Sequence, residues 1–212
     1  MPNVQNLIVA LRVGGAMIYP LLALAVVAVM VILEKGFVLA ARTRLPPALL
    51  RVVEAPSVAW DALEEQLTRV EPRNYFGRGF RVVLDNRTRP VWWVESRVVE
   101  ETSLIEQALG RWLWILETTV TAAPLLGLLG TITGMIRAFK LFGTEGLVDP
   151  RGVTGGVAEA LIATALGLFV ALIALFAFNF FSHRQAQVMD GMEQLGTRLI
   201  DFLRLDAPGG GR

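Results

Sequence analysis

Three stretches of the chain carry apolar side chains over a length that spans a membrane. They fall within 13–35, 118–140 and 153–182. At about 1.5 Å of rise per residue, a helix of about 20 residues crosses the ~30 Å hydrocarbon core of a bilayer. The first stretch is too long for the apolar part of a typical signal peptide and runs directly into Glu34 and Lys35, so we expect it to be retained. The pattern predicts a polytopic membrane protein with three transmembrane helices.

Outside these stretches, apolar residues recur at the three- and four-residue steps of amphipathic helices. One such helix is predicted over 57–70, with Ser57 as its cap, and a second near 76–84. A third begins after Pro90 and merges into the second span with no glycine-proline break, which predicts one long helix. The third span continues in the same way, so its helix is expected to extend towards 205. The apolar stripe of this extension consists of Val188, Met192, Leu195, Leu199 and Phe202.

Composition agrees with a membrane protein and narrows its chemistry. The 212 residues are 54% hydrophobic and only 18% charged, whereas soluble domains carry about 25% charge. The chain has no cysteine, and its one histidine is His183, so disulfides, thiolate sites and an imidazole metal cluster are excluded. A net charge of +1 provides no basic field for nucleic acid. The composition therefore indicates chemistry carried by oxygen side chains. We further expect no enzyme activity, no cofactor and no metal site.

The distribution of basic residues predicts the orientation of the chain. Most of its 20 lysines and arginines lie between Lys35 and Arg111 or in the C-terminal tail. Positive charge favours the cytoplasmic side of a membrane, so the N-terminus and the loop between the last two spans are expected to face outward. The predicted all-α chain thus has a short periplasmic N-terminus (1–12), transmembrane helix 1 (13–35), a cytoplasmic helical region (36–117), transmembrane helix 2 (118–140), a periplasmic loop (141–152), transmembrane helix 3 (153–182), and a cytoplasmic C-terminal helix with a frayed tail (183–212).

Glu159 is the single charged residue inside the third span. A charge at membrane depth costs roughly 2.5–3.5 kcal/mol on insertion scales, so such residues face a bundle interior or a wet cavity. A carboxyl withdrawn from water shifts towards its neutral form and can then bind and release protons. The alternative is a hydrated carboxylate at the outer interface, because Glu159 lies near the start of the span. The residue is therefore a candidate ion-pathway group.

Two threonines and a set of small residues are expected to surround this carboxyl. If the chain reverses near Gly146, Thr131 lies at a depth between Glu159 and Thr164, so two hydroxyls and a carboxyl share one membrane layer. Threonines in membrane helices often bond only to their own backbone, so the shared depth carries the argument. Small residues allow helix backbones to approach closely in lipid, either within one chain or between subunits. They are Gly127, Gly130 and Gly134 on the second span, and Ala160, Ala163, Gly167, Ala171 and Ala174 on the third.

Two blocks of sequence resemble the signature blocks of the MotA/TolQ/ExbB proton-channel family, on its TolQ/ExbB side. They are Ala-Pro-Leu-Leu-Gly-Leu-Leu-Gly-Thr-Ile-Thr-Gly-Met at 123–135 and Gly-Val-Ala-Glu-Ala-Leu-Ile-Ala-Thr-Ala-Leu-Gly-Leu at 156–168, the latter followed by Phe178-Asn179. The segment 14–35 resembles the family's first span. The order and separation of the blocks match as well, and the likeness is specific over 118–180 and loose over 45–90.

The resemblance implies an assembly and a set of pore residues. It implies a homo-oligomer, a pentamer, whose second and third helices line a pore around the membrane helices of an ExbD/TolR-like single-span partner that carries an aspartate. The family's pore glutamate falls on Glu159 and its two pore threonines fall on Thr131 and Thr164. Ile173 stands where the family often has proline, which puts a kink at this position in doubt.

The function implied is that of an ion-conducting subunit, most simply for protons, in the bacterial inner membrane. Such a subunit couples the proton motive force to mechanical work on a TonB/TolA-like protein, in TonB-dependent transport or Tol-Pal-type envelope work. Sodium is not excluded, because a carboxyl with hydroxyls suits either ion. Two alternatives stay open, namely a small secondary transporter with Glu159 as its coupling site and a non-conducting membrane scaffold.

Overall fold

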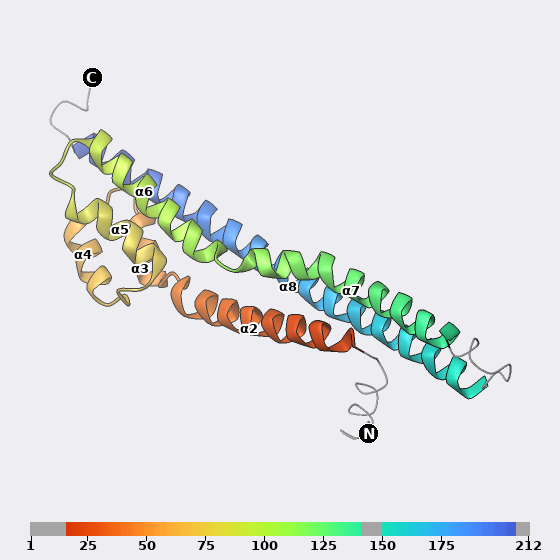
Figure 1. Cartoon of the computed structure of the whole chain (residues 1–212). Coiled ribbons are helices and arrows are strands. Elements are labelled where there is room, and N and C mark those ends of the chain that lie inside the picture. Colours follow the sequence, from red (N-terminus) through yellow and green to blue (C-terminus); the bar gives the residue numbers. More distant parts are fainter. Residues whose placement is uncertain (1–15, 141–149, 207–212) are drawn as a thin grey trace. The chain divides into compact units, whose positions relative to one another are not determined.

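The computed structural model describes residues 16–140 and 150–206, and in this part of the chain every regular element is a helix. The predicted all-α class is confirmed. Three helical stretches are long and apolar enough to cross a membrane, as the sequence predicts, namely Ile18–Arg42, Val91–Lys140 and Thr154–Asp206. In chain order (Figure 1) the helices are α2 (Ile18–Arg42), α3 (Pro47–Glu54), α4 (Trp60–Thr68), α5 (Tyr75–Asp85), α6 (Val91–Gly110), α7 (Leu113–Lys140) and α8 (Pro150–Asp206).

The chain divides into two compact units. The first takes in the chain up to Leu33 together with Trp112–Phe180, and the second takes in Glu34–Arg111 and the chain from Phe181 onward. The chain therefore passes between the units within α2, at the junction of α6 with α7, and within α8. Each unit has its own interior, so each is described by itself.

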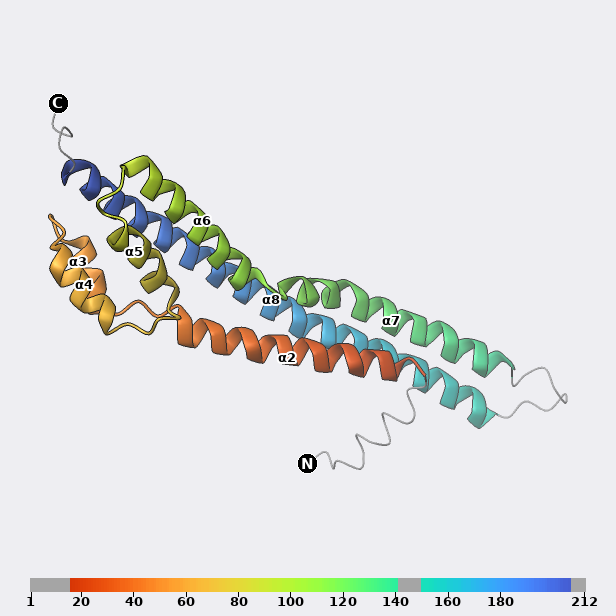
Figure 2. The same cartoon turned by 60° about the vertical axis from the view of Figure 1, so that its left-hand side comes forward.

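In the first unit, α7 and the N-terminal half of α8 run side by side as an antiparallel pair (Figures 1 and 2). Leu21 of α2 joins Ala123 of α7 and Ala171 of α8 in a small buried apolar cluster. α8 is one uninterrupted helix, so it continues beyond its apolar part as the sequence predicts and is not broken at Ile173. The turn expected near Gly146 and the frayed C-terminal tail lie outside the described residues.

The second unit is built on an apolar core from the C-terminal part of α2, from α3, α4, α5 and α6, and from the C-terminal half of α8. The predicted stripe on α8 contributes Met192 and Leu199 to this core, and α5 matches the helix predicted near 76–84. α3 was not among the predicted helices. The cap predicted at Ser57 is wrong, because α4 begins only at Trp60 and has no side-chain cap.

Tertiary contact explains the start of α4 better than a local cap does. Trp60 packs against the core, and its Nε1–H donates a 2.8 Å hydrogen bond to Oδ2 of Asp206. The helix therefore begins at the residue whose side chain is already held by α8. Such contacts routinely override local propensity.

The prediction of one long helix from Val91 into the second span is wrong at two residues. α6 ends at Gly110, Arg111 is extended with φ −52° and ψ 132°, and α7 begins at Leu113. Between them Trp112 has a φ of 68°, the left-handed conformation that side chains with a Cβ rarely adopt. Gly110 directly precedes this break, and a glycine near the end of a helical pattern is a signal for a helix end that the prediction of one long helix passed over.

Basic side chains from other elements bond the carbonyl ends of three helices in the second unit. The last carbonyls of a helix have no partner within it, and a positive charge suits the negative end of the helix dipole. Arg198 of α8 donates to Glu54 O at the end of α3, at 2.6 Å. Arg81 of α5 donates to Leu67 O near the end of α4, at 2.8 Å. Lys35 of α2 donates to Leu109 O near the end of α6, also at 2.8 Å.

Candidate ion-pathway site

Glycines bring the backbones of α7 and α8 into direct contact. A Cβ placed on Gly167 would lie 2.5 Å from Ala123 O, and one placed on Gly127 would lie 3.0 Å from the Cα of Thr164. A Cβ on Gly130 would lie 2.5 Å from the Cβ of Ala163. The small residues of the two predicted stripes therefore pack against each other within one chain. This contact sets which residues of the two helices face one another.

The two candidate threonines behave differently. The hydroxyl of Thr164 donates a 3.0 Å hydrogen bond across the helix pair to Gly127 O. The hydroxyl of Thr131 donates to Leu128 O of its own helix, at 2.6 Å. Within residues 16–140 and 150–206 the structure records no hydrogen bond from Thr131 to Glu159 or Thr164. Thr164 thus joins the two helices, whereas Thr131 satisfies its donor locally.

Glu159 is paired with Arg137, a residue that is not among those predicted for the site. Nη1 of Arg137, in the last turn of α7, donates to Oε1 of Glu159 at 2.7 Å. The carboxylate side chain is 20% exposed and the guanidinium side chain 51% exposed. A charge-assisted hydrogen bond of this length is short and strong. The carboxylate predicted to be alone in its helix therefore has a counter-ion on the neighbouring helix.

The hairpin register contained the signal that would have identified Arg137. With a reversal near Gly146, Arg137 faces position 155, one helical turn from Glu159. Side chains one turn apart on facing helices are within reach of a long guanidinium group.

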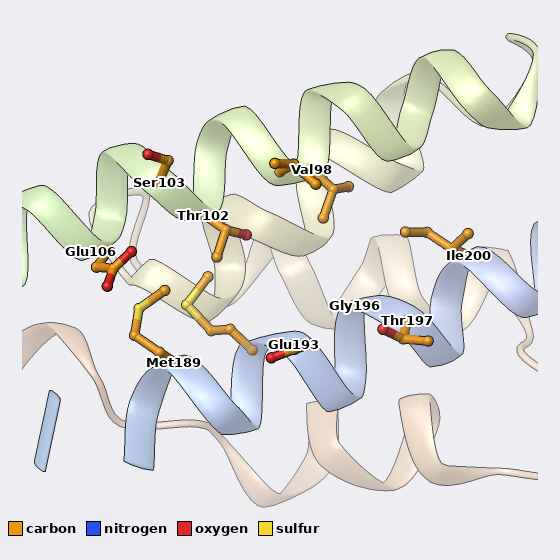
Figure 3. Close-up of a pocket in the computed structure, with 11 residues that line it drawn as sticks. Val98, Thr102, Ser103, Glu106, Met189, Glu193, Gly196, Thr197 and Ile200 are labelled. Carbon is orange, nitrogen blue, oxygen red and sulfur yellow. The ribbon is translucent and has the colours of Figure 1, made fainter. Parts of the chain in front are cut away.

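A separate groove lies in the second unit, between α6 and the C-terminal half of α8 (Figure 3). Its volume is about 490 Å³. Met189, Met192 and Ile200 provide apolar lining, and Glu106 and Glu193 bring carboxylates. Thr131, Thr164 and Glu159 all belong to the first unit, so the groove is no part of the candidate ion-pathway site.

The fold and the site together define a class of protein. Three apolar helices of membrane length, two of which are joined by an ion pair of a carboxylate and a guanidinium, are features of a multi-pass membrane protein. Residues 68–194 match the model of the MotA/TolQ/ExbB proton channel family, and the chain belongs to this family. The matched segment includes all of α7 and Glu159, so it contains the whole candidate ion-pathway site.

Individual relatives agree with the family match. An ExbB-like biopolymer transport protein of Synechocystis is 31% identical over 195 residues, which cover 88% of this chain and 74% of that protein. The biopolymer transport protein ExbB of Xanthomonas campestris is 44% identical over 88 residues, 42% of this chain. The Tol-Pal system protein TolQ of Pseudomonas aeruginosa is 39% identical over 84 residues, 40% of this chain. The aligned part spans 35% of the Xanthomonas protein and 36% of the Pseudomonas protein.

Proposed function

We propose that the chain is the ion-conducting subunit of an energy-transducing complex in the bacterial inner membrane, with protons as the ion. The observation that carries the proposal is the position of Glu159, a carboxylate of a membrane-length helix, at the contact between α7 and α8. Membership of the proton channel family supports the same role. In this role a proton binds a carboxylate oxygen of Glu159 from one side of the membrane and leaves towards the other.

The two threonines would assist this passage in different ways. Thr164 keeps an oxygen with free lone pairs at the helix contact, because its proton is already donated to Gly127 O. Such an oxygen can hold a water molecule beside the pathway. Thr131, bonded to its own backbone, would offer its lone pairs one helix away. Both roles are part of the proposal for Glu159 and depend on it.

The work would be done on a partner. We propose that the chain forms a homo-oligomer, a pentamer, around an ExbD/TolR-like single-span subunit. A TonB/TolA-like protein would receive the motion, and membrane lipid would surround the complex. Moving one elementary charge through 100 mV supplies about 2.3 kcal/mol, so the passage of several protons can drive the repacking of partner helices. The proton motive force would thus power either TonB-dependent transport or Tol-Pal-type envelope work.

The proposed topology assigns the first unit to the membrane and the second to the cytoplasm. The N-terminus and the 141–152 loop would be periplasmic, and the C-terminus cytoplasmic. The many basic side chains of the second unit support this orientation, because positive charge is retained on the cytoplasmic side. A cysteine-accessibility test suits this chain, which has no cysteine of its own. A cysteine in place of Ser57 should react only with reagents that reach the cytoplasm.

The ion function is tested by replacing Glu159 with Gln. The complex would be isolated from host membranes with its partners and reconstituted into liposomes, and proton entry would be followed with a trapped pH-sensitive dye. We expect Glu159→Gln to lower proton flux to that of protein-free liposomes while the complex keeps its size. Glu117→Gln, an exposed carboxyl of α7, is the matched control and should conduct normally. Normal flux through Glu159→Gln would refute the ion function.

The secondary-transporter alternative gains no support from the structure. Transporters of that kind place their coupling site in broken helices. α8, which carries Glu159, runs as a single helix from Pro150 to Asp206.

A further inference from the structure

The ion pair of Arg137 and Glu159 lies within a close part of the contact between α7 and α8. A Cβ on Gly134 would lie 3.0 Å from the Cβ of Ala160, and one on Gly156 would lie 2.8 Å from the Cβ of Ala138. These four small residues flank Arg137 on α7 and Glu159 on α8. The facing of the two charged residues is therefore set by backbone packing, which leaves the carboxylate little freedom to turn away.

The pairing changes what the carboxylate can do. Oε1 of Glu159 accepts a hydrogen bond from Nη1 of Arg137 at 2.7 Å. This charge-assisted bond joins a carboxylate and a guanidinium directly. Oε1 is therefore already occupied by the guanidinium, and a second cation is repelled by the fixed positive charge. A paired Glu159 is thus a poor relay for any ion.

The two partners differ in their freedom to move. The guanidinium side chain is 51% exposed, whereas the carboxylate side chain is 20% exposed. Arg137 lies in the last turn of α7, where a basic residue also favours the carbonyl end of the helix. Its long side chain can leave Glu159 and stay near those carbonyls. The movable member of the pair is therefore the arginine.

We propose that Arg137 is a gating residue, or lock. By pairing with Glu159 it closes the proton pathway of the subunit and prevents a proton leak that does no work. The pathway is closed while the guanidinium holds the carboxylate, and it opens when the guanidinium moves away. This inference rests on the proposed ion function of Glu159 and adds its regulation. Arg137 acts through Glu159 and carries no proton itself.

The test measures proton leak through the full-length chain reconstituted alone into liposomes with an imposed pH gradient. We expect Arg137→Gln to raise the leak about tenfold, the effect of losing one hydrogen bond to a charged group. Arg137→Lys keeps the charge and should restore a low leak. The double variant Arg137→Gln/Glu159→Gln should leak no more than the wild type, because the carboxyl is gone. Lys140→Gln removes a charge from the same turn and is the matched control, since Lys140 forms no ion pair with any residue the structure describes.

A chemical version of the test restores the charge in the folded protein. The natural chain has no cysteine, so Arg137→Cys gives a single thiol at a half-exposed position. Reaction with a positively charged thiol reagent should suppress the leak of this variant, and a neutral reagent of similar size should not. Circular dichroism of each variant in detergent shows whether it is folded, and Arg137→Lys serves if the cysteine variant is not.

The outcomes separate this inference from the proposed function. If Glu159→Gln abolishes flux in the complex but Arg137→Gln leaves the leak of the chain unchanged, the ion function stands and the lock is refuted. A leak that persists in the double variant also refutes the lock, because it does not pass through Glu159. If the complex of Arg137→Gln loses flux as Glu159→Gln does, Arg137 is required for conduction and is no lock. Normal flux in the Glu159→Gln complex refutes the proposed function itself.

Discussion

Nζ of Lys35 donates a 2.8 Å hydrogen bond to the main-chain carbonyl of Leu109, one residue before α6 ends at Gly110. Lys35 is only 1% exposed, and a second carbonyl, Ala108 O, lies 3.4 Å from the same nitrogen. The carboxylate of Glu34 lies 3.7 Å away. A buried ammonium and the unpartnered carbonyls of a helix end thus satisfy each other. The C-terminal end of α6 is therefore stabilised from α2.

Replacing Lys35 with Met should therefore destabilise the protein. The substitution keeps the apolar stem but leaves buried carbonyls without a donor, at a cost of about 1–3 kcal/mol. We expect a lower midpoint of thermal unfolding in detergent, followed by circular dichroism. Lys140→Met is the matched control, because Lys140 is the only other lysine and is exposed. Equal midpoints for the two variants would contradict the capping role.

The close contact of α7 and α8 predicts a rescue between two small residues. Gly130→Ala should push the helices apart, because the new Cβ would meet that of Ala163 at 2.5 Å, and overpacking of this kind costs about 1–3 kcal/mol. The double variant Gly130→Ala/Ala163→Gly removes the second Cβ and should recover most of the stability in detergent. Gly155→Ala, which meets nothing within 4 Å, should be neutral or stabilising. A double variant no more stable than Gly130→Ala would show that the two helices do not pack in this register.

The hydrogen bond of Thr164 to Gly127 O predicts a small, specific loss. Thr164→Val keeps the shape of the side chain and removes the donor, and membrane-helix hydrogen bonds contribute about 0.6 kcal/mol. Thr133→Val removes bonds that stay within α7, from Thr133 to Leu129 O and Gly130 O, so its effect should be smaller. The free energies of unfolding of the two variants are compared in mixed micelles of lipid, detergent and sodium dodecyl sulfate. A larger effect at Thr133 would argue against a bond between the helices.

The left-handed conformation of Trp112 predicts opposite preferences at two neighbouring tryptophans. At Trp112, Gly should be more stable than Ala by about 1 kcal/mol, because a Cβ is strained at a φ of 68°. At Trp114, inside α7, Ala should be more stable than Gly by about 1 kcal/mol, because Gly is a poor helix former. Thermal unfolding of the four variants gives both differences. If Ala is preferred at both positions, the helix runs through Trp112 without a break.

Apolar periodicity determined the three spans, the all-α class and most of the helices. It could do so because a helix that buries one face must repeat its apolar residues at the helical period. The stripe of small residues on α7 and α8 was visible for a similar reason, since only small side chains allow backbones to touch. The sequence did not predict α3 or the true start of α4, because both depend on packing within the second unit. The cluster of basic residues indicated orientation, but three of its members, Lys35, Arg81 and Arg198, also cap helix ends.

The features of the candidate site were likewise predicted only in part from the sequence. The sequence alone determined that Glu159 is a charge inside a membrane-length helix, with Thr164 near it. Only the tertiary structure decided that Arg137 pairs with this carboxylate and that Thr131 bonds to its own helix. A pattern along one helix reports which face is buried, whereas a partner on another helix depends on the register between the two. That register is set by glycines and alanines of both helices that meet across the contact, so the sequence of one helix alone does not determine it.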